Sequence, residues 1–204
     1  MPDPTLLDKV LPVIGMRDMV YAKITADTAE GTVYGAVKQL QGVQKLGFKP
    51  NSAQQQSYGD DGIFCVVNSA GDAEGEIEMN TIPPEMEADW FGRSLDANGA
   101  VVMSSADMPN DVAIGFRAKK QDGSDKLVWL YKCTPSSPES AFATQESGNV
   151  TIQNRKVPFK ATRRLSDGNM KIAIDSNTAT LAASVVTNWT KAVYEPAATK
   201  TVDA

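Results

Sequence analysis

The chain contains no histidine among its 204 residues. This absence excludes most zinc sites, the Ser-His-Asp and Cys-His nucleophile systems, and the usual proton carrier near pH 7. An enzyme without histidine must work with carboxylates, lysine or tyrosine, and no convergent set of these residues is visible in the sequence. We therefore expect that the protein is not an enzyme, and that it has no catalytic residues, no metal site and no cofactor.

Cysteine is almost absent as well, with only Cys65 and Cys133 present. Each lies in an apolar, strand-like run, IFCVV and LVWLYKC respectively. Two buried, reduced thiols are the favoured interpretation, ahead of a disulfide or a metal pair. This interpretation fits synthesis in a reducing cytoplasm.

Long apolar runs and an excess of basic residues are also missing. No run approaches the roughly 18 apolar residues that a membrane helix needs, and the segment MPDPTLLDKVLPVIGM lacks the pattern of a secretory signal. The formal net charge of -5 speaks against tight binding to nucleic acid, which usually requires a basic patch. We expect no membrane association and at most transient contact with DNA.

What the sequence does contain is a series of short alternating or apolar runs separated by Gly, Asp and Pro, which is typical of strands and turns. The proline-bearing residues 1–17 predict an extended arm, and the polar residues 50–62 predict a flexible connection ending in a Gly-Asp-Asp-Gly turn. The Asp60-Asp61 pair could bind a divalent cation, but turns select Asp and Gly in any case. Strands are expected at residues 18–27, 42–50, 63–70 and 75–82, with a turn at SAGDAEG between the last two.

The stretch GEIEMNTIPPEMEADWFG, residues 75–92, places carboxylates on one face of a strand. Glu76 and Glu78, with Glu74 before them, lie about 7 Å apart at successive same-face positions, which is within the range that glycoside hydrolysis uses. The same pattern describes the solvated face of an antiparallel sheet without any further assumption. The solvated face is the favoured interpretation.

A short helix is expected directly after that strand. Pro83-Pro84 suits a helix start and Gly92 a helix stop. Met86 and Trp90 share one helical face, which predicts that they point toward the core.

Two hairpins are predicted further along the chain, each with Asp-Gly at its tip. The first joins residues 112–118 to 127–133, and the second joins 157–161 to 170–174. A second helix is expected after Ser176, with Ser176 or Asn177 as its cap and Leu181, Val185 and Trp189 on one face. Together the elements predict a mainly β protein of seven to ten strands: an antiparallel β-sandwich or partly closed barrel at 18–175, flanked by one helix, with a C-terminal helix and tail at 176–204.

The second predicted hairpin concentrates positive charge at Arg155, Lys156, Lys160, Arg163 and Arg164. A nucleic-acid patch would need exposed aromatic residues among these side chains, and Phe159 falls instead in the apolar phase. Contact with an acidic surface of another subunit is the better use of this charge.

These motifs, in this order, resemble the major tail proteins, or tail tube proteins, of long-tailed, non-contractile bacteriophages of Gram-positive hosts. The resemblance covers about residues 20–174. Its markers are DMVYAKIT, the SYGDD turn, GEIEMNTIPPEMEADWFG, the VAIGFRAKK…LVWLYKCTPSSPESAFATQES hairpin with its exit, and VPFKATRRLSDGNMKI. The series of motifs carries the resemblance, and no single motif would suffice.

The resemblance implies a β-sandwich subunit of the virion tail that forms hexameric rings, which stack into a tube through which DNA passes at ejection. It implies contacts with other tail proteins, such as the tape measure, tail terminator and distal tail proteins, and no chemistry. Polar segments at 1–17, 50–62, 135–149 and 195–204 are then expected to order on a neighbouring subunit.

Within such a tube we expect Glu76 and Glu78 to face the lumen, and Arg155, Arg163 and Arg164 to lie at subunit contacts or outside. The rival interpretation is a monomeric β-sandwich module that binds carbohydrate or a cell surface. That function would require an exposed aromatic row or a long groove.

Overall fold

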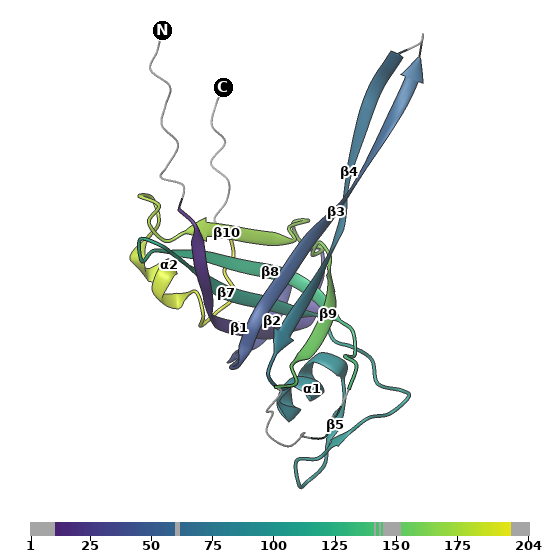
Figure 1. Cartoon of the computed structure of the whole chain (residues 1–204), viewed down its shortest axis with the longest axis vertical. Coiled ribbons are helices and arrows are strands. Elements are labelled where there is room, and N and C mark those ends of the chain that lie inside the picture. Colours follow the sequence, from purple (N-terminus) through teal and green to yellow (C-terminus); the bar gives the residue numbers. More distant parts are fainter. Residues whose placement is uncertain (1–10, 60–61, 141, 143, 145–151, 197–204) are drawn as a thin grey trace.

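A computed structural model describes residues 11–59, 62–140, 142, 144 and 152–196 of the chain. Its centre is one antiparallel eight-stranded sheet with the order β2-β1-β7-β8-β9-β4-β3, in which β10 also pairs with β8 (Figure 1). The strands of this sheet are β1 (Val13–Asp27), β2 (Thr32–Gln39), β3 (Val43–Gly59), β4 (Gly62–Met79), β7 (Val112–Lys120), β8 (Asp125–Pro135), β9 (Arg155–Ala161) and β10 (Lys171–Asp175). Two short strands, β5 (Ser94–Leu95) and β6 (Val101–Val102), form a separate pair.

The sheet bends so that its two halves form a sandwich around the main core. Side chains of β1, β7 and β8, such as Tyr21, Ile114 and Leu130, share one buried cluster with Ile77 of β4 and Phe159 of β9. The order of strands ends in β2 and β3, so the sheet is open and not a closed barrel. The predicted fold class, a mainly β antiparallel sandwich, is confirmed.

A second core lies on the opposite face of β1, β7 and β8. Here Val20, Leu127 and Trp129 are buried under Trp189 of the C-terminal residues. The molecule is therefore layered: a half-sheet, the main core, the other half-sheet, the second core and the C-terminal residues.

Helix α1 (Pro84–Phe91) closes one end of the main core, as the sequence predicts. Proline occupies the first helical turn, and Gly92 ends the helix in the left-handed conformation with φ 68°. Met86 and Trp90 are 1% and 0% exposed, so the inward face is the predicted one.

The first predicted hairpin is confirmed, whereas the second is wrong. β7 and β8 pair across the turn before Asp125. β9 instead pairs with β4 and with the end of β8, while β10 pairs with the earlier part of β8. Both strands thus follow one edge of β8 in succession, and the residues between them are a connection rather than a hairpin turn. Alternation indicates which face is buried, but it does not specify the partner strand.

The predicted arm and connection are more ordered than expected. Val13 to Arg17 of the predicted arm belong to β1 and pair with β7. The polar residues 50–59 continue β3, and β4 runs unbroken from Gly62 through the predicted SAGDAEG turn. Asp60 and Asp61 lie outside the described residues, as do residues 1–10, most of 141–151 and 197–204.

Two further expectations need correction. Cys133 is buried, but Cys65 is exposed because its part of β4 pairs only with β3 and has no core beneath it. Helix α2 (Ala183–Asn188) is shorter than predicted and begins after Ala182 without a side-chain cap. Ser176, the predicted cap, instead accepts a hydrogen bond from the Asp125 backbone through its hydroxyl.

The packing of β4 against β9 predicts that Gly75 cannot carry a side chain. A Cβ atom at this position would lie 2.1 Å from Cζ of Phe159 and 2.7 Å from the carbonyl oxygen of Gly47. We expect Gly75→Ala to lower the free energy of unfolding by about 1–3 kcal/mol, the usual cost of overpacking. Gly15→Ala is the matched control, because its Cβ would have no neighbour within 4 Å. Equal urea-unfolding midpoints for the two variants would contradict this account of the contact.

Candidate assembly surfaces

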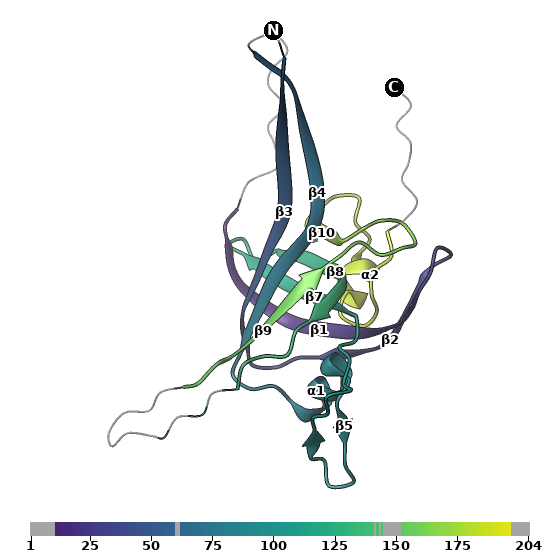
Figure 2. The same cartoon turned by 90° about the vertical axis from the view of Figure 1, so that its right-hand side faces the viewer.

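The most prominent surface feature is a two-stranded ribbon made of residues 52–59 and 62–71. β9 supports β4 only from Ala73 to Met79, whereas β3 and β4 continue to pair with each other up to Gly59 and Gly62. At about 3.4 Å per residue the paired part of the ribbon is about 27 Å long. It projects from the sandwich, away from the end that carries α1 (Figures 1 and 2). An isolated two-stranded hairpin is marginally stable in water, so this ribbon is well suited to a partner.

Both ends of the sheet are also open to partners. β2 and β3 are the terminal strands of the described sheet, and each therefore has one backbone edge without a strand beside it. Such edges are templates for pairing with another chain. Pro50 lies in β3, in accordance with the confinement of proline to edge strands.

A charged wall covers the solvent face of β3, β4 and β9. The predicted carboxylates are on it: Glu76 is exposed and Glu78 half-buried, while Ile77 between them is in the core. Glu74 and Glu78 each lie opposite a lysine on both adjacent strands, whereas Gly47 and Pro158 lie opposite Glu76. The wall thus comprises four lysines and four acidic residues: Lys45, Lys49, Lys156 and Lys160, and Asp72, Glu74, Glu76 and Glu78.

The carboxylates of this wall have partners, which the sequence pattern did not indicate. Lys156 lies 3.6 Å from Glu76, and Lys160 lies 3.4 Å from Asp72. Asn154 donates a hydrogen bond of 2.9 Å to Glu78. The predicted solvated face is thus a row of partnered carboxylates, and the wall carries balanced charge. That Glu76 and Glu78 face a lumen stays a prediction. Each of these ion pairs is exposed and stabilises the fold by at most about 1 kcal/mol.

The three predicted contact arginines lie in different environments. Arg163 is exposed, and Arg155 at the start of β9 stacks on the exposed ring of Phe142 with a separation of 4.5 Å. For these two residues a role at a subunit contact stays a prediction. Arg164 is only 2% exposed and is engaged within its own subunit.

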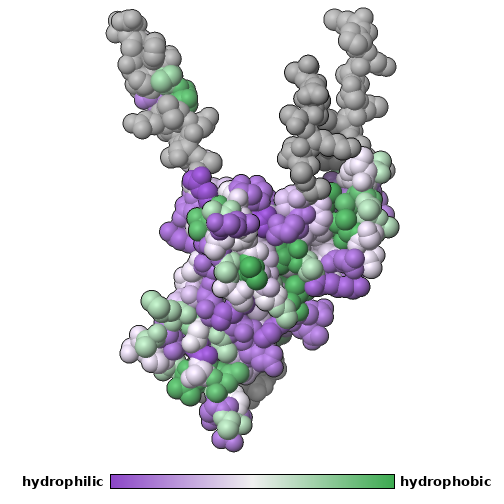
Figure 3. Space-filling model, turned by 180° about the vertical axis from the view of Figure 1, so that it is seen from behind, coloured by the Kyte–Doolittle hydropathy of each residue, from purple (hydrophilic) through white to green (hydrophobic). Residues whose placement is uncertain are grey.

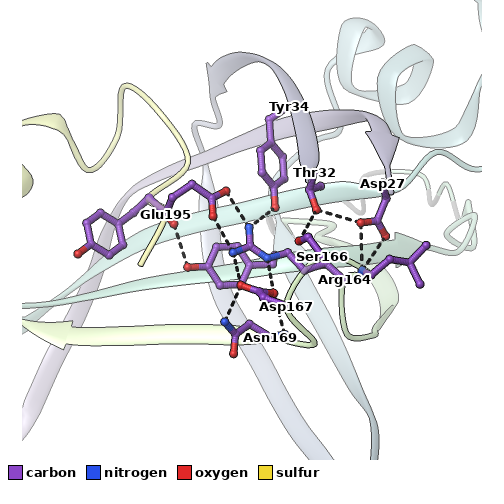
Figure 4. Close-up of polar contacts among 11 residues, drawn as sticks. Asp27, Thr32, Tyr34, Arg164, Ser166, Asp167, Asn169 and Glu195 are labelled. Atoms are coloured by element: carbon purple, nitrogen blue, oxygen red, sulfur yellow. Dashed lines mark hydrogen bonds and ion pairs between the residues drawn. The ribbon is translucent and has the colours of Figure 1, made fainter. Parts of the chain in front are cut away.

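Arg164 is the centre of a polar cluster that joins four parts of the chain (Figure 4). Its guanidinium makes paired hydrogen bonds of 2.6–2.7 Å to Asp167 and to Glu195, and a further one to the Tyr34 hydroxyl. The guanidinium also lies 4.0 Å from the ring centroid of Tyr131. The planar fork of arginine suits such bidentate contacts, which lysine cannot reproduce.

The hydrogen bonds of the cluster favour the charged forms of Arg164 and Asp167. Burial alone would lower the pKa of Arg164, but its hydrogen bonds to Asp167 and Glu195 raise that pKa above the ordinary arginine value. The hydrogen bonds from Arg164 in turn hold the pKa of Asp167 well below the usual aspartate range. The sequence pattern alone predicts a surface position for Arg164, because Tyr34 and Glu195, two of its partners, are remote in sequence and give no local signal.

Asp27, at the end of β1, holds the loop that carries Arg164 by a hydrogen bond from the backbone of Leu165. It accepts hydrogen bonds from the Thr32 hydroxyl and the Leu165 backbone, and it pairs with Lys132 at 2.8 Å. Burial would raise the pKa of Asp27, but these partners lower it below its ordinary value. The turn between β1 and β2 is thereby tied to β8 and to the loop.

The end of the molecule opposite the ribbon exposes apolar side chains. They belong to β5, β6 and the following loop: Leu95, Val102, Met103 and Met108. Figure 1 places β5 at this end, and Figure 3 shows an apolar area near the lower end of the molecule. Met103 and Met108 are 71% and 79% exposed. Ribbon and apolar end thus lie at opposite ends of the subunit.

The part of the chain that the structure describes shows no group of three or more residues placed to hold a metal ion. Over the same residues, no helix has both the length and the apolar character needed to cross a membrane. Trp90, Trp129 and Trp189, the three tryptophans of the chain, are all buried.

No protein-family model and no curated protein matches the chain. Among solved structures, the chain is similar to the cap that terminates the tube of the anti-feeding prophage, determined by cryo-electron microscopy. The TM-score is 0.42 at 10% sequence identity, and the match covers 86% of this chain and 100% of that one. A similarity of this size supports no conclusion about function.

The Arg164 cluster generates a prediction about stability. We expect Arg164→Ala to lower the free energy of unfolding by about 2–4 kcal/mol, between the values typical of exposed and fully buried ion pairs. Arg164→Lys should fall between the wild type and Arg164→Ala, because it keeps the charge and loses the fork. Arg163→Ala is the control and should change stability by less than about 0.5 kcal/mol. Similar urea denaturation curves for the alanine variants at positions 163 and 164 would contradict the assigned role.

Proposed function

We propose that the chain is a structural virion protein, the major tail protein of a long-tailed, non-contractile bacteriophage. In this proposal six subunits form a ring, and rings stack into the tube through which DNA is ejected. The protein is synthesised in the bacterial cytoplasm and functions in the virion tail, without a membrane, a cofactor or catalysis. Its other partners are further tail proteins at the ends and inside the tube.

The observation that carries the proposal is the projecting ribbon. It exposes backbone and side chains well beyond the sandwich, whereas a monomeric protein is expected to shorten or cover such a feature. The ribbon lies at one end of the subunit and the exposed apolar side chains at the other, so the two ends present different surfaces. Unlike ends favour head-to-tail stacking, in which one type of contact repeats along an axis.

The open backbone edges of β2 and β3 support the proposed ring. A subunit with one free edge at β2 and another at β3 can present both to its neighbours, and closure around a ring would leave no edge exposed. The sequence resemblance, which spans both strands, independently indicates the same kind of assembly.

The alternative function, a monomeric module for carbohydrate or cell-surface binding, is less well supported. Sugar-binding sites rely on exposed aromatic platforms, but all three tryptophans are buried in the two cores. Among the aromatic side chains whose exposure the structure describes, only the Phe142 ring is largely exposed, and Arg155 stacks on it.

Removal of the ribbon tests the proposal. Asn51 and Asp72 lie side by side, with a 3.4 Å hydrogen bond between their side chains, so an Asn-Gly turn can replace residues 52–71. We expect a folded, soluble subunit with a cooperative melt, and with the smaller strand signal in circular dichroism that loss of the ribbon implies. This subunit should no longer form long tubes in negative-stain micrographs at any concentration. Tubes of normal length from this variant, or a wild type that remains monomeric at high concentration, would overturn the proposed assembly.

A second prediction concerns the charged wall, which we propose lines the bore. Glu76→Gln together with Glu78→Gln would leave the wall's four lysines facing only two acidic residues. DNA phosphates should then bind, and the binding should weaken steeply with salt because counterions are released. We expect such tubes to retain DNA at low ionic strength and to release it at about 0.5 M salt, where screening acts within a few ångströms.

Lys156→Gln together with Lys160→Gln is the matched control on the same face, and its tubes should retain no DNA. Equal DNA retention by both double variants, or by neither, would show that the wall does not face the bore. The tube assignment itself would survive that result.

A further inference from the structure

The outer face of β1, β7 and β8 is covered by residues 181–195, which we term the C-terminal strap. Trp189 of the strap is 1% exposed and packs on Val20, Leu127 and Trp129 of the sheet. Its ring stacks with that of Tyr194 at 5.1 Å between centroids. Without the strap, this apolar sheet face would be open to water.

Four side chains hold the strap. Three of them, on β7 and β8, donate hydrogen bonds to backbone carbonyls of the strap, and the fourth, Arg164, follows β9 and binds a side-chain carboxylate. Arg117 donates a hydrogen bond of 2.7 Å to the carbonyl of residue 186, Trp129 one of 3.1 Å to that of 189, and Tyr131 one of 2.9 Å to that of 194. Arg164 donates two hydrogen bonds to the Glu195 carboxylate. These donors recognise a peptide in a single register, from the helix α2 to the side-chain carboxylate of Glu195.

The strap has little structure that could persist without this surface. α2 has six residues and no side-chain cap, far below the length at which a helix is stable alone. In the described part of the chain, hydrogen bonds between the strap's backbone and other backbone groups stay within the strap or reach back only to Thr178. The sandwich itself ends at Ser176, which is anchored to Asp125 by hydrogen bonds of 2.8 Å.

We propose that the outer sheet face is a peptide-docking surface, and that the strap is its separable ligand, which a second copy of the chain can supply. Three of the donors that hold the strap, Arg117, Trp129 and Tyr131, lie on β7 and β8, and Asp167 and Tyr34 hold the fourth, Arg164. A strap from another copy therefore meets the same surface, and its own strap competes only through its higher effective concentration. This inference goes beyond the proposed tube function, since it rests on contacts within one chain.

Binding of the strap in trans tests the proposal. The full chain carrying Trp189→Ala keeps all four donors and loses the anchor of its own strap. A fluorescent peptide of residues 178–196 should bind this chain saturably by anisotropy, and at least tenfold more tightly than it binds the wild-type chain, whose surface is occupied. The same peptide carrying Glu195→Gln should bind at least tenfold more weakly, because it loses the charged contact with Arg164.

Circular dichroism and a cooperative melt establish that the Trp189→Ala chain is folded. If that chain does not fold, the full chain carrying Glu195→Gln replaces it, since this change removes only a contact at the rim. The proposal is overturned if the folded variant binds the peptide no better than the wild-type chain does. Equal binding of the wild-type and Glu195→Gln peptides would also overturn it.

Discussion

Burial of β8 on both faces is the constraint on which the rest of the structure depends. Leu130 points into the main core, while Trp129 and Tyr131 on either side of it point into the second core. Along its edges the same strand pairs with β7, β9 and β10. Since β8 contacts both half-sheets and lies under the C-terminal strap, a change there would reach every layer of the molecule.

The sequence predicts those parts of the fold that local chemistry determines. The run LVWLYKC is apolar at nearly every position, as a strand buried on both faces must be. Pro83-Pro84 and Gly92 set the limits of α1, and Asp-Gly marks the turn between β7 and β8. Each of these signals lies within a few residues of the structure that it specifies.

The parts that sequence reasoning missed depend on distant partners. The alternation in residues 157–161 is equally compatible with pairing to β10 or to β4, and packing selected β4, where Gly75 admits the ring of Phe159. The pairing of Arg164 with Glu195 joins two residues that lie outside the helices and strands and 31 positions apart. The ribbon strands have no core to impose an apolar pattern. The alternation at Glu76 and Glu78 predicts a solvent face, but the neighbouring lysines belong to two other strands, so the pattern of a single strand does not indicate them.

Cys65 is exposed, so its thiol is accessible to reagents in solution, unlike that of Cys133. The other cysteine, Cys133, is enclosed by the main core, and burial raises the pKa of its thiol above the ordinary value. A thiol reagent therefore meets two chemically unequal sites, with β4 carrying the open one within the ribbon. The native chain thus contains a built-in attachment point for a spin label or fluorophore on the element that projects furthest from the body. A label at this position would report the surroundings of the ribbon without any engineered residue.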